Sequence, residues 1–115
     1  MTAVLEQATT WSDVCALDAL VCGRGAAAMI AGTQVALFRL ADDDVVAISN
    51  YDPFSDAFVM SRGIVGSKGD VVKVASPVFK HNFDVRTGAC LDDPTVSLPT
   101  YDVAVVDGRV LVALT

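Results

Sequence analysis

Closely spaced turn residues are the feature that most restricts the fold of this chain, because they leave room only for short segments between them. The clearest instance is Asp107-Gly108, which separates two apolar runs at residues 101–106 and 109–114. A pair of this kind between β-rich runs is typical of a hairpin with a type I′ turn, where glycine takes the required positive φ at no steric cost. The C-terminal segment therefore predicts two antiparallel strands.

The same pattern recurs upstream. Further strands are predicted over residues 26–30, 34–40, 45–49 and 71–75. The first two are joined by Ala31-Gly32-Thr33, which suggests a second hairpin. Asp42-Asp43-Asp44 reads as a polar turn, since it lacks the spacing of a calcium-binding loop. Helical periodicity is weak, and only residues 10–20 could hold a helical turn or two. We expect an all-β protein, a small antiparallel sandwich or barrel.

Length and composition indicate one compact domain. A chain of 115 residues, 53% hydrophobic and 19% charged, is globular in composition. At this length about two-thirds of the unfolded surface can be buried, so no metal or disulfide is needed to hold a core. We expect a single domain over residues 1–115, with residues 1–10 as a loose N-terminal arm.

Charge and patterning point to the cytoplasm. The net charge of −6 argues against nucleic acid, which is bound through clustered Lys and Arg. The first residues show no signal peptide, and the most apolar stretch, residues 16–40, is too interrupted to span a membrane. Cys15, Cys22 and Cys90 are odd in number and show no CxxC spacing, which predicts small core side chains more readily than reactive or ligating thiols.

Two loop motifs carry a family resemblance. Residues 50–54 read NYDPF, and residues 76–79 read SPVF, with Phe83-Asp84 and Thr87-Gly88 following. This order resembles Rieske-type ferredoxin domains, in which one loop supplies Cys-x-His and the other Cys-x-x-His to a [2Fe–2S] cluster. The resemblance implies a Rieske-type, ISP-like antiparallel sandwich or barrel with two loops where a cluster would sit.

The four ligand positions of that frame are all substituted. Asp52 and Ser76 stand at the Cys positions, and Phe54 and Phe79 at the His positions. A phenyl ring has no lone pair for iron, and a serine hydroxyl is a poor ligand for a soft iron–sulfur site. We therefore expect no cluster, no metal and no catalytic or cofactor-binding residue in this chain. We expect Phe54 and Phe79 to face each other and fill the vacated space.

Other chemistry receives little support from the residues. His81 is the single histidine, and with Asp52, Asp56 or Asp84 it makes weak evidence for a different metal site. Ser76 has no paired base nearby in sequence to activate it as a nucleophile. No glycine-rich nucleotide-binding fingerprint is present.

Within the Rieske superfamily, the chain resembles the small subunits of assimilatory NAD(P)H-dependent nitrite reductase. The matching segments are residues 11–15, 50–66 and 75–94. The resemblance implies a cytoplasmic complex that reduces nitrite to ammonium, in which a large subunit carries FAD, an iron–sulfur cluster and sirohaem. The small chain would itself be non-catalytic and would dock to, stabilise or orient the large subunit.

The loops at the former cluster position are the expected contact surface, because aromatic and Met side chains are enriched at interfaces. The candidate interface residues are Tyr51, Phe58, Met60, Val78 and His81. Phe54 and Phe79 are expected in the core. Two alternatives remain open: an electron-transfer ferredoxin with unusual ligands at Asp52, Ser76 or His81, and a free-standing regulatory or binding β domain.

Overall fold

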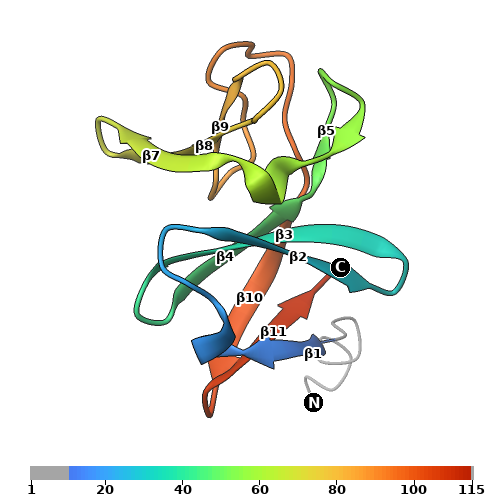
Figure 1. Ribbon diagram of the computed structural model, residues 1–115, viewed down its shortest axis with the longest axis vertical. Helices are drawn as coiled ribbons and strands as arrows, with labels where there is room; N and C mark the ends of the chain where they lie inside the picture. The colour runs from blue at the N-terminus through green and yellow to red at the C-terminus, as the bar shows by residue number, and fades with distance from the viewer. Residues whose placement is uncertain (1–10, 115) are drawn as a thin grey trace, which may run out of the picture.

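The computed structural model describes residues 11–114, which form an all-β molecule elongated along one axis, with principal extents of 44 × 29 × 28 Å. A six-stranded sheet occupies one end, and two smaller sheets occupy the other (Figure 1). The elements are β1 (Trp11–Ala16), η1 (Leu17–Ala19), β2 (Gly25–Ile30), β3 (Thr33–Ala41), β4 (Asp44–Ser49), β5 (Tyr51–Asp52), β6 (Ala57–Phe58), η2 (Met60–Arg62), β7 (Ile64–Lys68), β8 (Val71–Ala75), β9 (Asn82–Asp84), β10 (Thr100–Val106) and β11 (Arg109–Ala113). The expected antiparallel β architecture is confirmed.

The large sheet has the order β1-β11-β10-β4-β3-β2, and every neighbouring pair is antiparallel. Two of its hairpins turn on the residue pairs Ala31-Gly32 and Asp107-Gly108, and all four residues have positive φ. Those angles are the ones a type I′ turn requires, and they match the right-handed twist of the flanking strands. The sheet curls into a barrel that stops short of closure between its edge strands, β1 and β2.

Alternation along the strands divides the core into two clusters. On β3, Val35 and Leu37 face the inside of the barrel, while Ala36 and Phe38 face the smaller sheets. The first pair joins a barrel cluster that includes Val110 and Val112. The second pair joins a cluster shared with the other end of the molecule, completed by Ile48, Met60, Val74, Phe83, Val85, Cys90 and Leu98. This shared cluster fixes the two ends of the molecule relative to each other.

The N-terminal region contains both a strand and a helical turn. Trp11–Ala16 is the strand β1, paired with β11, and the helical turn expected within residues 10–20 is the single 3₁₀ turn η1. Strand pairing wins here because β11 would otherwise present an unpaired edge over the barrel core. The expected arm at residues 1–10 lies outside the described residues.

Cysteine placement is mixed. Cys90 is buried in the shared core, and Cys15 is half-buried against the barrel core, where burial raises the pKa of its thiol. Cys22, in contrast, is exposed, so the expectation of a core position is wrong for that residue. It lies in the connection between η1 and β2, where a single bridge to Arg39 holds the backbone while the side chain faces out.

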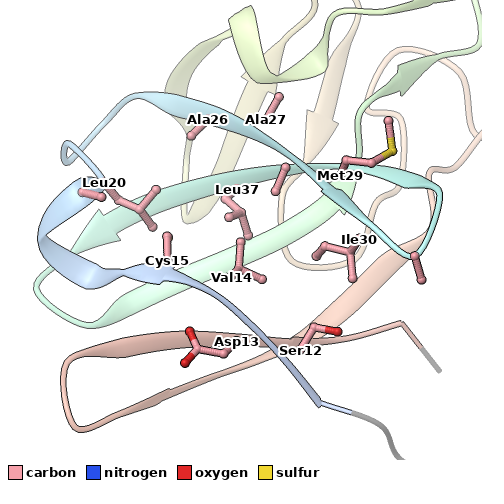
Figure 2. A pocket seen from close by; sticks show the side chains of 13 residues that line it. Ser12, Asp13, Val14, Cys15, Leu20, Ala26, Ala27, Met29, Ile30 and Leu37 are labelled. Carbon is pink, nitrogen blue, oxygen red and sulfur yellow. The ribbon is translucent and has the colours of Figure 1, made fainter.

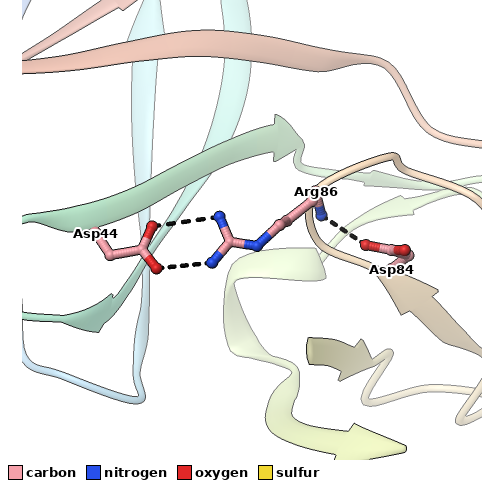
Figure 3. A network of polar contacts seen from close by, with 3 residues as sticks. All are labelled: Asp44, Asp84 and Arg86. Carbon is pink, nitrogen blue, oxygen red and sulfur yellow. Dashed lines mark hydrogen bonds and ion pairs between the residues drawn. The ribbon is translucent and has the colours of Figure 1, made fainter. Parts of the chain in front are cut away.

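Hydrogen bonds and an ion pair connect the smaller sheets, β5–β6 and β7–β8–β9, to the large sheet. Buried Asn50 accepts a hydrogen bond from the Ser61 backbone N–H at 2.7 Å, and its amide donates to Gln34 Oε1 and to the Phe58 carbonyl. On the surface, the Arg86 guanidinium pairs with both carboxylate oxygens of Asp44 (Figure 3). No helix in residues 11–114 is long and apolar enough to cross a membrane.

Gly88 provides a test of this packing. Its φ is +80°, and an added Cβ would lie 2.0 Å from the carbonyl oxygen of Leu98, whose N–H bonds back to Gly88. We expect Gly88→Ala to lower the free energy of unfolding by more than about 3 kcal/mol, through strain and steric overlap. Gly69→Ala, with positive φ but open space, should cost about 1 kcal/mol. Urea unfolding followed by circular dichroism measures both, and equal losses would contradict the packing argument.

Candidate functional site

Two loops meet at the end of the molecule farthest from the barrel (Figure 1). The first is the tip of the β5–β6 hairpin, closed by a hydrogen bond from the Asp56 N–H to the Asp52 carbonyl at 2.8 Å. The second follows β8 and is closed by hydrogen bonds from the Ser76 N–H to the His81 carbonyl and from the Lys80 N–H to the Ser76 carbonyl. Asp56 and Lys80 both adopt positive φ, which turns each loop tightly back on itself.

A buried hydrogen bond joins the loops at their bases. Asp52 and Ser76 are both fully buried, and the Ser76 hydroxyl donates to Asp52 Oδ2 at 2.5 Å. The same oxygen accepts from the Ser55 hydroxyl at 2.8 Å, and Oδ1 accepts from the Phe54 backbone N–H at 3.0 Å. A buried carboxylate is costly unless such donors surround it. The two residues at the former Cys positions therefore tie the loops together.

The donors also decide the charge state of Asp52. Burial favours the neutral acid, but hydrogen bonds from Ser76, from Ser55 and from the backbone N–H groups of Phe54 and Ser55 outweigh it. The net effect is a pKa below the ordinary value for aspartate, because every donor stabilises the anion. Asp52 is thus an ionised acceptor at neutral pH, held by four donors from two segments of chain.

The aromatic packing differs from the expected pair. Phe54 stacks on His81, with ring centroids 3.6 Å apart and ring planes within 7° of parallel. The Phe54 ring also packs against the core residue Phe83, with a distance of 6.2 Å between the two ring centroids. Phe79 is more than half exposed, so the predictions that it lies in the core and faces Phe54 are wrong. The tight turn through Lys80 reverses the chain after Phe79, which directs the Phe79 ring outward and brings His81 back over the first loop.

Cluster binding does not fit this arrangement. The Rieske-type frame implies two thiolates and two imidazoles, whereas the carboxylate and hydroxyl at the Cys positions are bonded to each other, and the phenyl rings offer no lone pair. Within residues 11–114, no group of three His, Cys, Asp or Glu side chains could hold a metal ion. His81 Nδ1 is buried without a hydrogen-bond partner, and the ring is covered by Phe54.

The predicted interface residues fall into different environments. Phe58 and Val78 are exposed, Tyr51 and His81 are partly buried, and Tyr51 donates its hydroxyl hydrogen bond to Asp56, which raises the tyrosine pKa. Met60 is fully buried in the shared core, so its placement in a contact surface is wrong: it begins η2, which packs against β2 and β3.

Two polar residues of the site were not anticipated from sequence. Ser55 donates to Asp52, and Asn50 holds the start of the hairpin to η2. The signal available for Ser55 was its position three residues after an aspartate in a turn, where Asx-type hydrogen bonding is common. Asp84, a candidate metal ligand together with His81, instead accepts hydrogen bonds from the backbone N–H groups of Arg86 and Thr87.

A separate groove lies at the open seam between β1 and β2 (Figure 2). It has a volume of about 560 Å³ and is lined mainly by small or apolar side chains, among them Val14, Ala26, Ala28 and Leu37. Its charged group, Asp13, already pairs with Arg109 at 2.9 Å. The polar side chains among its described lining residues, Ser12, Asp13 and Cys15, all come from β1, so the other strands that line the groove offer no polar side chain to face them, as a catalytic pocket would require.

The contact between Asp52 and Ser76 can be tested by a double-mutant cycle. We expect Asp52→Ala to lower the free energy of unfolding by about 2–4 kcal/mol and Ser76→Ala by about 1–2 kcal/mol, because each leaves buried groups unpaired. The coupling energy should be about 1–3 kcal/mol. Chemical unfolding measures all four species. Asp102→Ala, at an exposed strand position, is the matched control and should change stability by less than about 0.5 kcal/mol.

The lowered pKa of Asp52 predicts a specific pH dependence. Its contribution to stability is present above about pH 4, the ordinary aspartate value, and is lost as pH falls through the lower pKa of the folded state. Asp52→Asn cannot ionise, so the stability difference between wild type and this variant should shrink between pH 6 and pH 2. Urea unfolding at several pH values measures it, and a difference that stays constant or grows would contradict the assignment.

Comparisons with known proteins agree with the geometry. Residues 10–113 match the family described as the Rieske-like [2Fe-2S] domain. The chain is 42% identical over 101 residues to the nitrite reductase (NADH) small subunit of Salmonella typhimurium, covering 87% of this chain and 94% of that relative. It is also similar to a crystal structure named as an NADH-dependent nitrite reductase small subunit from Mycobacterium tuberculosis, with 50% identity, a TM-score of 0.88, and coverage of 91% and 95%.

A further similarity is of a different kind. The chain is 36% identical over 102 residues to a protein named nitrite reductase [NAD(P)H] large subunit from Klebsiella oxytoca. That match covers 89% of this chain but only 11% of the Klebsiella protein, so the similar region is one segment of a much longer polypeptide. Taken with the two small-subunit matches over nearly their whole length, these findings show that the chain belongs to the Rieske-like [2Fe-2S] domain family and, within it, to the nitrite reductase small subunits.

Proposed function

We propose that this chain is a cluster-free, non-catalytic subunit of a cytoplasmic assimilatory nitrite reductase. In this role it docks to and stabilises a large subunit that carries FAD, an iron–sulfur cluster and sirohaem and reduces nitrite to ammonium with NAD(P)H. The described residues act as one domain whose contribution is a binding surface.

The observation that carries the proposal is the segment of the Klebsiella large subunit that resembles this chain. A domain that is a separate chain in some organisms and part of the catalytic polypeptide in another works beside the same catalytic machinery in both cases. Direct contact between the two parts is the simplest reason for them to be joined. This supports the large subunit as the partner of the present chain.

The chemistry of the loops supports a non-redox role. Asp52 and Ser76 are hydrogen-bonded to each other, and Phe54 is stacked on His81. Three of the four positions that hold iron in a Rieske ferredoxin therefore take part in structural contacts. The alternative of an electron carrier with unusual ligands would require breaking that contact and exposing a buried carboxylate. The residues therefore favour docking over electron transfer.

Co-purification with activity measurement tests the proposal. A tagged form of this chain should retain the large nitrite reductase subunit from the same organism, and adding it should raise or stabilise nitrite-dependent NAD(P)H oxidation by that subunit. The chain purified alone should show no visible absorption and far less than stoichiometric iron. Stoichiometric iron with a visible spectrum would support the electron-carrier alternative, and failure to bind the large subunit would support a free-standing β domain.

A further inference from the structure

Exposed apolar side chains are concentrated where the two loops meet. Three large apolar residues there have substantial exposure: Phe58 at 53%, Val78 at 46% and Phe79 at 58%. We refer to these three as the tip surface. Large exposed apolar groups gathered in one region mark contact sites more often than chance exposure does. Four other exposed large apolar residues, Trp11, Val21, Met29 and Val106, lie on separate segments of the barrel, and Ile64 lines a groove with Gly23 and Gly25 near the start of β2.

Two segments of chain bring the tip surface together. Phe58 ends the β5–β6 hairpin, and Val78 and Phe79 lie in the second loop, shortly after β8. The hydrogen bond between Asp52 and Ser76 joins hairpin and loop. The exposed side chains therefore belong to one end of the molecule, although they are up to 21 positions apart in sequence.

The loops that carry these side chains are closed by hydrogen bonds in the free chain. The second loop is closed by the Ser76–His81 and Lys80–Ser76 backbone bonds, and the Val78 N–H also approaches the Ser76 hydroxyl at 3.5 Å. A surface that is already ordered loses less conformational entropy when it binds. Aromatic side chains on such rigid supports are typical anchors of protein interfaces.

Charged groups of both signs border the tip surface. Asp56 lies in the hairpin tip, and Asp92 accepts a 2.7 Å hydrogen bond from the N–H of Asn82, directly after the second loop. Lys80 lies on the second loop itself, and the ammonium group of Lys73 on β8 donates a 2.7 Å hydrogen bond to the Asn82 side chain. The border is therefore mixed in charge, and the contact area of the tip surface is defined by its apolar side chains.

We propose that the tip surface is the docking surface for the large subunit, with Phe79 as its anchor, and that it enters an apolar recess of that subunit. This inference rests on the proposed function and adds to it the surface and the chemistry of the partner's site. The apolar side chains supply affinity through their burial in the complex.

The anchor is tested by measuring the affinity of purified large subunit for matched variants. Phe79→Ala should raise the dissociation constant about tenfold or more, and Phe58→Ala should raise it by a smaller factor. Val106→Ala, at a similarly exposed position on β10, is the control and should leave the dissociation constant unchanged within about twofold. Because these side chains are largely exposed, thermal unfolding should confirm that all three variants remain folded.

The outcomes separate this inference from the proposed function. If wild-type chain does not bind the large subunit, the proposed function fails and this inference fails with it. If wild type binds and Phe79→Ala binds equally well, while Val106→Ala or Met29→Ala binds weakly, docking occurs through the barrel and only the present inference is overturned. Weak binding by Phe79→Ala with normal binding by Val106→Ala supports both.

Discussion

The hydrogen bond between Ser76 and Asp52 is the contact on which the loop end of this molecule depends. In a Rieske cluster domain, iron joins the same two loops through covalent ligand bonds. Here a buried carboxylate takes over that connection, and its ionised state is sustained by donors from both segments. Removing one partner would leave a charge or a hydroxyl buried without compensation, which is far costlier than the net gain from making the bond. The contact therefore links the two loops directly through side chains of the chain itself.

The hydrogen bond between Ser76 and Asp52 keeps the two-loop scaffold of a Rieske domain but changes the chemistry that the loops offer. The loops still stand at the end of the molecule, ordered and close together, but the groups between them have no redox chemistry. What remains available to a partner is their outer surface, formed by side chains such as Phe58 and Phe79. Membership in a family of reductase subunits and the absence of suitable iron ligands are therefore compatible, because binding a catalytic chain requires only shape, apolar area and charge.

Local sequence signals predicted the scaffold well and the side-chain directions poorly. The pairs Ala31-Gly32 and Asp107-Gly108 located two hairpins, since few residue pairs tolerate the required φ values. The strand β8 was also predicted to the residue. The outward direction of Phe79 was missed because it depends on the positive φ of Lys80, a residue type that gives no warning of that conformation. Burial of Met60 was missed because it depends on how η2 packs on strands distant in sequence.

The exposed position of Phe79 shows how the packing of a cofactor site can change when its ligand residues are substituted. Filling the vacated space with the two rings at the His positions would have hidden both from solvent and left a polar loop end. Instead, His81 covers Phe54, the buried polar pair occupies the Cys positions, and Phe79 is left outside. Exposing a phenyl ring brings no stability to the isolated chain, because the hydrophobic effect favours its burial. Because the interior is already satisfied without it, the Phe79 ring is an apolar group that remains available to a partner surface.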